Sequence, residues 1–197
     1  MDIYVIIAAL MGYASGSIPF GLLLTKAAGL GDVRQIGSGN IGATNVLRTG
    51  NKFIAAATLI ADMLKGTIPI WLAWRFGEPF ALAAALGAFL GHLYPVWLQF
   101  KGGKGVATFV GILLGLSPHI FALFVAAWLA TAFTFRFSSL AALVAAGLCA
   151  LASFWLTSSG ASVTIVLLTV MIFYRHHENI ARLIKGTESR INFSKKA

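Results

Sequence analysis

Long apolar stretches recur along the whole 197-residue chain and limit its fold more than any other feature. A bilayer is crossed by a helix of about 20 apolar residues. Only 11% of the residues are charged, against about 25% in a typical soluble domain. The sequence therefore predicts an all-α polytopic integral membrane protein of about seven transmembrane helices, forming a single domain over residues 1–197. The seven runs are 3–24, 53–74, 79–98, 106–117, 119–135, 140–156 and 161–174.

Two of these runs, 106–117 and 161–174, are short for a span. They must use flanking residues or begin inside a cavity lined by protein. The first run follows Met1 and Asp2 directly, with no basic segment before it and no small-residue cleavage site after it. We therefore expect it to be kept as a helix rather than removed as a signal peptide.

Positive charge is distributed unevenly among the connections. The first, third and fifth connections and the C-terminal tail hold thirteen of the fifteen Lys and Arg residues. The positive-inside rule then places the N-terminus outside and the C-terminus in the cytoplasm. The rule and anionic lipid headgroups also explain the net charge of +9, so no nucleic-acid partner is expected.

Cysteine and metal chemistry are disfavoured. The single cysteine, Cys149, lies in an apolar run, where its thiol should stay protonated and inert. The adjacent His176 and His177 point about 100° apart on a helix and lack further ligands nearby, so we expect no metal and no cofactor.

The first connection is rich in glycine and in small polar residues. Glycine lets successive backbone N–H groups turn toward one point, and Ser, Thr and Asn add side-chain donors. Arg48 would add a guanidinium fork for phosphate oxygens. An anion-binding loop and a flexible turn both fit this pattern. The candidate ligands are Gly37, Ser38, Gly39, Asn40, Thr44, Asn45 and Arg48.

The third connection runs from a basic, glycine-rich segment directly into an apolar helix. A helix N-terminus favours an anion, so we expect the lysines and the backbone N–H groups around Gly103 to hold a phosphate. The spacing differs from a Walker A loop because a glycine, not a hydroxyl residue, follows Lys104. The alternative is a tight turn whose two lysines only set the orientation of the helices in the membrane. The candidates are Lys101, Gly102, Gly103, Lys104, Gly105 and Thr108.

Several polar residues lie within or at the end of the apolar runs. Asp62 and Lys65 are one helical turn apart, and His92 lies late in the third run. Such groups suggest function, but a self-neutralising pair that fixes packing explains Asp62 and Lys65 equally well. Small residues of the first and third runs, including Ser17, are typical of close helix packing.

Taken together, these motifs resemble the bacterial acyl-phosphate:glycerol-3-phosphate acyltransferase family. The resemblance covers nearly the whole chain, through segments 17–21, 37–48, 62–66, 91–95, 101–108 and 175–182. It implies transfer of a fatty acyl group from acyl phosphate to the 1-hydroxyl of sn-glycerol 3-phosphate. The products would be 1-acyl-glycerol 3-phosphate and phosphate, at the start of phospholipid synthesis. It also implies a bacterial inner-membrane location with the active site facing the cytoplasm.

The resemblance also implies roles for particular residues. Ser38 and Arg48 match the family's first motif, and Gly102, Gly103 and Lys104 match its phosphate loop. His176 and Asn179 match the third motif, with Glu188 as its later glutamate and His177 as a second candidate for the functional histidine. Ser17, Asp62, Lys65 and His92 would support the site.

Direct transfer without an acyl-enzyme is the favoured mechanism, because acyl phosphate is already activated and has a good leaving group. No histidine is followed five residues later by aspartate, the arrangement of soluble acyltransferases. Either a substrate phosphate oxygen or His176 would accept the hydroxyl proton. A transporter of phosphate or a small organic anion is the alternative function. The oligomeric state is left open.

Overall fold

The computed structural model describes residues 3–191, and within that range every regular element is a helix. The all-α prediction is confirmed. The chain forms two compact units, Met1–Pro118 and His119–Ala197.

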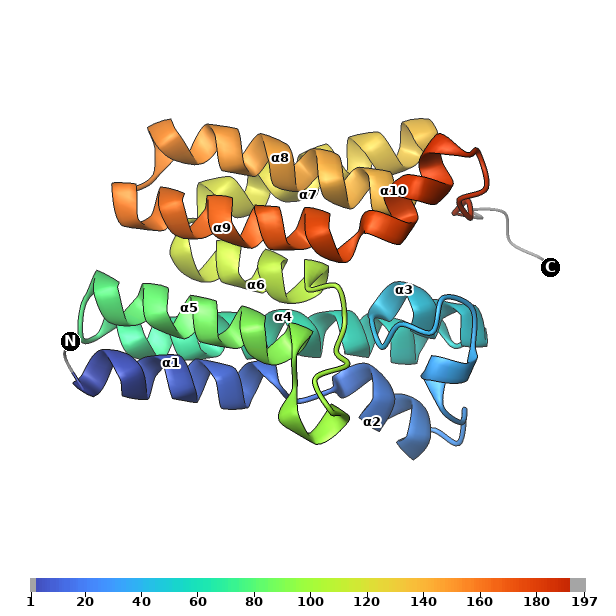
Figure 1. Ribbon diagram of the computed structural model, residues 1–197, viewed down its shortest axis with the longest axis horizontal. Coiled ribbons are helices and arrows are strands. Elements are labelled where there is room, and N and C mark those ends of the chain that lie inside the picture. The colour runs from blue at the N-terminus through green and yellow to red at the C-terminus, as the bar shows by residue number, and fades with distance from the viewer. Residues whose placement is uncertain (1–2, 192–197) are drawn as a thin grey trace. The chain divides into compact units, whose positions relative to one another are not determined.

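In the first unit, four helices pack along one another (Figure 1). They are α1 (Ile3–Gly16), α4 (Lys52–Trp74), α5 (Glu78–Leu93) and α6 (Val106–Leu116). Shorter elements lie toward one end of this bundle (Figure 1). These are α2 (Phe20–Ala27), η1 (Val33–Gln35), α3 (Ala43–Val46), η2 (Leu47–Thr49) and η3 (Val96–Leu98).

Small residues bring α1 and α5 into backbone contact. A Cβ atom added at Gly12 or Gly16 would overlap the backbone of α5, and one added at Gly87 or Gly91 would overlap the backbone of α1. Only glycine allows two helices to approach this closely. The predicted packing role of these glycines is therefore confirmed.

The first apolar run is broken between α1 and α2 by Pro19. The break leaves carbonyl groups without helical partners, and side chains from other elements satisfy two of them. Lys65 Nζ donates to the Ile18 carbonyl at 2.8 Å, and Trp97 Nε1 donates to the Ser17 carbonyl at 2.7 Å. The break is thus fixed from both α4 and η3.

The second unit contains α7 (Pro118–Phe135), α8 (Ser138–Leu156), α9 (Ser159–Arg175) and α10 (His177–Ile184). Ser158 begins α9 as a side-chain N-cap, accepting from the Ala161 N–H at 3.1 Å. The axis bends by 60° where α9 gives way to α10. His176 lies at this bend, between the end of α9 and the start of α10.

Helices occur at all seven predicted runs of the chain. Within residues 3–191, five helical segments are long and apolar enough to cross a membrane, or six if α9 and α10 together form one span. The remaining run is α6, which has 11 residues. Many large apolar side chains are exposed, such as Phe154, Trp155 and Val170, as expected of surfaces facing lipid. The full count of seven spans stays a prediction.

Candidate active site

The first connection is folded over a small apolar core. Val33 and Val46 are fully buried, and Ile41 nearly so, together with Leu22 of α2 and Ala55 of α4. This core holds η1 and α3 against the ends of α2 and α4. The connection is therefore packed against the helices, which favours an ordered loop over a flexible turn.

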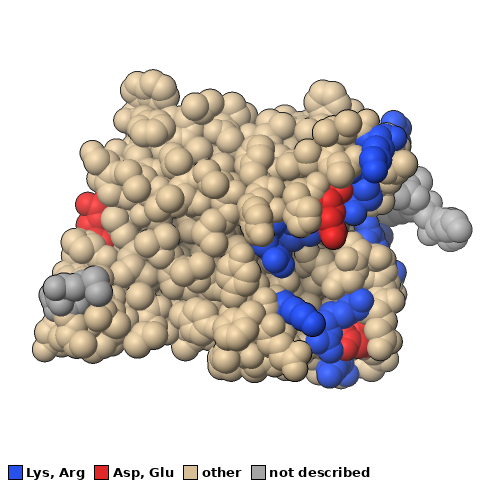
Figure 2. All heavy atoms as spheres, in the orientation of Figure 1, with Lys and Arg blue, Asp and Glu red and all other residues tan. Residues whose placement is uncertain are grey.

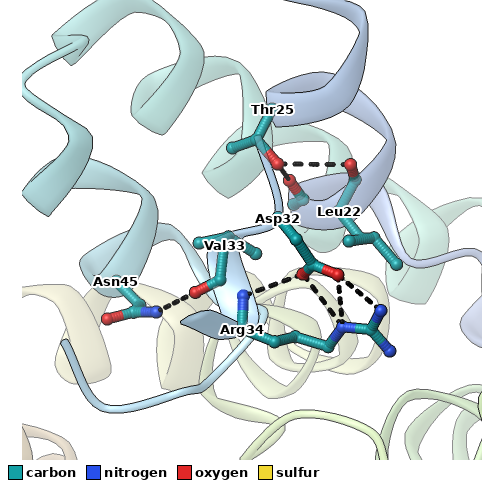
Figure 3. A network of polar contacts seen from close by, with 7 residues as sticks. Leu22, Thr25, Asp32, Val33, Arg34 and Asn45 are labelled. Carbon is teal, nitrogen blue, oxygen red and sulfur yellow. Dashed lines mark hydrogen bonds and ion pairs between the residues drawn. The ribbon is translucent and has the colours of Figure 1, made fainter. Parts of the chain in front are cut away.

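An exposed ion pair closes the start of η1. The Asp32 carboxylate accepts from the Arg34 backbone N–H at 3.0 Å and binds the Arg34 guanidinium, with a shortest distance of 2.6 Å (Figure 3). These hydrogen bonds from Arg34 lower the pKa of Asp32 to about 2. Arg34 is therefore engaged within the chain.

Asn45 organises the loop from its centre. Its side chain is buried, and Nδ2 donates to the carbonyls of Val33, Ile36 and Asn40 at 2.8, 2.9 and 2.8 Å. Figure 3 shows its amide nitrogen directed at the Val33 carbonyl. These contacts draw η1 and the turn after it onto α3. Although predicted to bind phosphate, Asn45 thus has its amide group directed into the protein.

The other end of the same amide meets two of the predicted catalytic residues. Asn45 Oδ1 accepts from the Ser38 N–H at 3.0 Å, from Ser38 Oγ at 3.3 Å and from Arg48 Nη1 at 3.2 Å. Ser38 and Arg48 are both exposed, so they are brought together at the surface of the unit. The predicted grouping of a serine and an arginine in this loop is present.

Glycine is required where the loop approaches Arg48. Gly37 has φ of +56°, and a Cβ atom there would lie 2.6 Å from the Arg48 side chain and from Asn45 Oδ1. Gly39 also has positive φ, at +68°. Asn40 forms a local turn, in which Oδ1 accepts from the Gly42 N–H at 3.0 Å. Thr44 is exposed on α3.

In the third connection, the two central glycines pack tightly against the end of α5. The N–H of Gly102 donates to the Leu93 carbonyl at 3.0 Å, and that of Gly103 donates to the His92 carbonyl at 3.1 Å. A Cβ atom on Gly103 would collide with the buried imidazole of His92. These two N–H groups are used within the chain, which corrects the prediction that they cradle a phosphate.

The rest of this connection leads into α6. Lys101 is exposed and Lys104 is half-buried, just before the helix. Gly105 begins α6 with φ of +85°, and Thr108 is fully buried in its first turn. Any phosphate held here would therefore meet the two lysines and the start of α6, rather than the N–H groups of Gly102 and Gly103.

The ionisable residues of α4 form a buried ion pair. Lys65 Nζ lies 2.7 Å from Asp62 Oδ1, and both side chains are 2% exposed. Because Lys65 also donates to the Ile18 carbonyl, its ammonium group is committed to the α1–α2 break. These contacts favour the packing interpretation of the pair. Ser17 is buried at the same break.

In the second unit, the two adjacent histidines differ in environment. His176 is buried and its Nδ1 lies 2.8 Å from the Ile172 carbonyl. Because a carbonyl only accepts, Nδ1 carries the proton, and in the neutral form of the ring Nε2 would be the acceptor. His177 is exposed, with Nδ1 2.9 Å from the Tyr174 carbonyl.

Glu188 gathers the side chains that follow His176. Its carboxylate accepts from Asn179 Nδ2 at 2.6 Å, Arg182 Nε at 2.6 Å and Ser139 Oγ at 2.7 Å. Burial acts to raise the pKa of Glu188, but these three hydrogen bonds outweigh it and hold the pKa below its ordinary value. Neither Ser139 nor Arg182 has a role predicted from the sequence. Ser139 belongs to no motif, and Arg182 was included only as the last residue of the 175–182 segment.

Basic residues gather at one end of each unit. In Met1–Pro118, Lys26, Arg34, Arg48 and Lys101 are exposed on the connections around α2 and α3. In His119–Ala197, Arg136 and Arg190 are exposed beyond the ends of the helices. Figure 2 shows the same concentration of Lys and Arg atoms over these segments, beside a largely uncharged surface.

The fold and the site define an integral membrane protein with apolar helices and basic, glycine-containing connections suited to anionic substrates. Comparison with known proteins is more specific. A family model described as "Glycerol-3-phosphate acyltransferase" matches residues 6–186. The chain therefore belongs to the glycerol-3-phosphate acyltransferase family, as the motifs predicted.

Individual relatives agree with this assignment. A glycerol-3-phosphate acyltransferase of Mesorhizobium japonicum is 58% identical over 94% of this chain and 95% of that protein. One from Methylorubrum extorquens is 60% identical over 95% and 93%, respectively.

Two solved structures are also similar. One is the glycerol 3-phosphate form of PlsY (YgiH), an integral membrane glycerol 3-phosphate acyltransferase, with 37% identity and a TM-score of 0.87 over 96% of this chain and 94% of that chain. The other, the lysophosphatidic acid form, has 35% identity and a TM-score of 0.88 over 95% of each.

Proposed function

We propose that this enzyme transfers a fatty acyl group from acyl phosphate to the 1-hydroxyl of sn-glycerol 3-phosphate. The hydroxyl oxygen forms a bond to the acyl carbonyl carbon, and the bond from that carbon to the phosphate oxygen breaks. The hydroxyl proton leaves with phosphate or passes to a base. The products are 1-acyl-sn-glycerol 3-phosphate and inorganic phosphate.

One observation carries the proposal: Ser38 and Arg48 meet on a single acceptor, Asn45 Oδ1, in a member of this family. A guanidinium and a hydroxyl fixed side by side on an exposed loop suit the oxygens of a phosphate. The names of the relatives and the glycerol 3-phosphate bound form of the similar enzyme support glycerol 3-phosphate as the acceptor substrate.

The transfer is proposed to be direct. Arg48 and Lys104 would stabilise the negative charge that develops on the carbonyl oxygen and on the departing phosphate. His176 is suited to act as base or to orient the hydroxyl, because its Nδ1–H···O=C bond to Ile172 fixes the orientation of the ring and makes Nε2 the acceptor in its neutral form. A substrate phosphate oxygen is the competing proton acceptor.

The proposal extends to the whole chain and its place in the cell. The family model covers residues of both units, which supports one acyltransferase domain over residues 1–197. We propose seven spans in the bacterial inner membrane, with the N-terminus outside and the active residues and C-terminus facing the cytoplasm.

The decisive experiment incubates purified protein with radiolabelled glycerol 3-phosphate and either palmitoyl phosphate or palmitoyl-CoA. Formation of the lysophospholipid with palmitoyl phosphate alone is the expected result. Product from palmitoyl-CoA alone would overturn the proposed donor. In parallel, proteoliposomes should show no saturable uptake of labelled phosphate or glycerol 3-phosphate. Uptake without acyl transfer would instead establish a transporter.

A further inference from the structure

The amide of Asn45 is used at both ends, and this fixes its orientation. On one side lie three carbonyl groups, which only accept, and on the other lie an N–H, a hydroxyl and a guanidinium. The nitrogen must therefore face the carbonyls and the oxygen must face Ser38 and Arg48. Neither aspartate nor a purely apolar residue offers this combination.

Burial strengthens the constraint on the amide. Asn45 is 2% exposed, on a short helix whose next residue, Val46, is fully buried in the core under the loop. Gly37 lies close against both Asn45 Oδ1 and the Arg48 side chain. The amide thus has little freedom to move away from Ser38 and Arg48.

The three hydrogen bonds that Asn45 Oδ1 accepts differ in strength. An amide oxygen has two lone pairs, so three donors cannot all bind it strongly. The Ser38 N–H is the shortest at 3.0 Å, while Arg48 Nη1 and Ser38 Oγ lie at 3.2 and 3.3 Å. The backbone contact holds the loop, whereas the guanidinium and hydroxyl can leave the amide for a stronger, anionic acceptor.

We propose that Asn45 is a positioning residue that holds the Ser38 hydroxyl and the Arg48 guanidinium in place for a substrate phosphate, without binding the substrate itself. The inference rests on the proposed function of that loop. Holding both donors in advance reduces the ordering needed when the substrate binds and reacts.

A double-mutant cycle on kcat/KM for glycerol 3-phosphate tests this, with Asn45→Ala, Arg48→Lys and the double variant. Because a misplaced group can cost about 100-fold in rate, we expect Asn45→Ala to lower kcat/KM by roughly tenfold to 100-fold. If Asn45 acts through Arg48, the kcat/KM of the double variant should lie within about threefold of that of the less active single variant. Multiplication of the two single effects would overturn the proposal.

Asn51→Ala provides a matched control for stability. Asn51 is the half-buried N-cap of α4 in the same unit, and its Oδ1 accepts only the Ile54 N–H at 3.0 Å among the hydrogen bonds described for that atom. We expect it to lower Tm without a comparable loss of kcat/KM. If Asn51→Ala lowers kcat/KM as much as Asn45→Ala at equal loss of Tm, the effect of Asn45 is merely structural and the proposal fails.

Binding separates this inference from the proposed function. Calorimetry should measure the Kd of glycerol 3-phosphate for the parent, the two single variants and the double variant. We expect the two losses of affinity to be non-additive, as for kcat/KM. A parent protein that binds glycerol 3-phosphate but transfers no acyl group would refute the proposed function, and the binding cycle would still decide the role of Asn45. Additive losses of binding would refute positioning alone.

Discussion

At the scale of single residues, Gly103 shows that a glycine in a motif typical of phosphate binding can serve helix packing instead. Its N–H donates to the His92 carbonyl, and its Cα faces the His92 imidazole. A methyl group at this position has to displace a buried ring. Gly103→Ala should therefore destabilise the protein by about 1–3 kcal/mol, as overpacking of a core typically does.

The measurement is the shift of Tm in detergent. Gly147→Ala is the matched control, because a Cβ atom at Gly147 in α8 has no neighbour within 4 Å. We expect the control to keep the Tm of the parent. An unchanged Tm for Gly103→Ala, with a raised KM alone, would contradict the packing role and restore the idea of an amide cradle.

Lys104 should behave differently from Gly103, because its contribution is charge. Lys104→Met keeps most of the side-chain length and removes the ammonium group beside the start of α6. Loss of a group that stabilises developing negative charge costs about 100-fold to 1,000-fold in kcat. We expect a loss of roughly tenfold to 1,000-fold in kcat at saturating substrate. A raised KM with normal kcat would assign Lys104 to ground-state binding instead.

At the scale of elements, the Asp62–Lys65 pair supports the junction of α1 and α2. Lys65→Met would leave the Asp62 carboxylate buried without its partner and remove the side-chain donor of the Ile18 carbonyl, which would keep only the Phe20 N–H among the donors described. Removing one partner of a buried pair typically costs about 3–5 kcal/mol. The variant should show a large fall in Tm, and Asp62→Asn combined with Lys65→Met should recover part of it. A double variant no more stable than Lys65→Met would argue against charge pairing as the cause.

The stability of the folded protein should depend on pH through Glu188, which follows α10. Its pKa lies below the ordinary value of 4.5, so the carboxylate stabilises the folded protein above pH 4.5. That contribution is lost as the pH falls through the lower folded-state pKa. Glu188→Gln should therefore have a lower Tm than the parent at neutral pH, and the difference should shrink below pH 4.5.

Glu178→Gln is the control for this pH series. Glu178 is 68% exposed and lies 3.9 Å from Arg182, so its removal should change Tm little at any pH. A Tm difference between parent and Glu188→Gln that stays constant from pH 7 to pH 3 would rule out the carboxylate as the titrating group.

The helices themselves could be predicted from apolar length. The first run was predicted as one segment over 3–24, but the structure divides it into α1 and α2 at Pro19, which has no backbone donor. The loops were harder, because the use of each polar group depends on contacts distant in sequence. Asn45 looked like a phosphate ligand among glycines, yet the apolar neighbours Ile41 and Val46 hold its helix against a core, and its amide is buried. Likewise, the N–H of Gly103 is used only because the connection returns to the end of α5.

At the scale of the whole molecule, the charge distribution predicts the orientation in the membrane. Lys and Arg residues are concentrated in the first, third and fifth connections and in the tail, which the positive-inside rule assigns to the cytoplasm. A reporter fused after Ala197 should then be active only if it functions in the cytoplasm. Activity of an exclusively periplasmic reporter at that position would reverse the assignment.

Cysteine labelling tests the same orientation within the chain. Cys149 is buried and contributes packing, so Cys149→Ala should keep turnover within about twofold and supply a cysteine-free background. On it, Ser159→Cys at the start of α9 should react with a membrane-impermeant maleimide in intact cells, because Ser159 is exposed and precedes a span that ends inside. Ala28→Cys, exposed just after α2, should react only after the membrane is opened. The opposite pattern would place the first connection, and with it Ser38 and Arg48, outside the cell, where a cytoplasmic supply of acyl phosphate could not reach them.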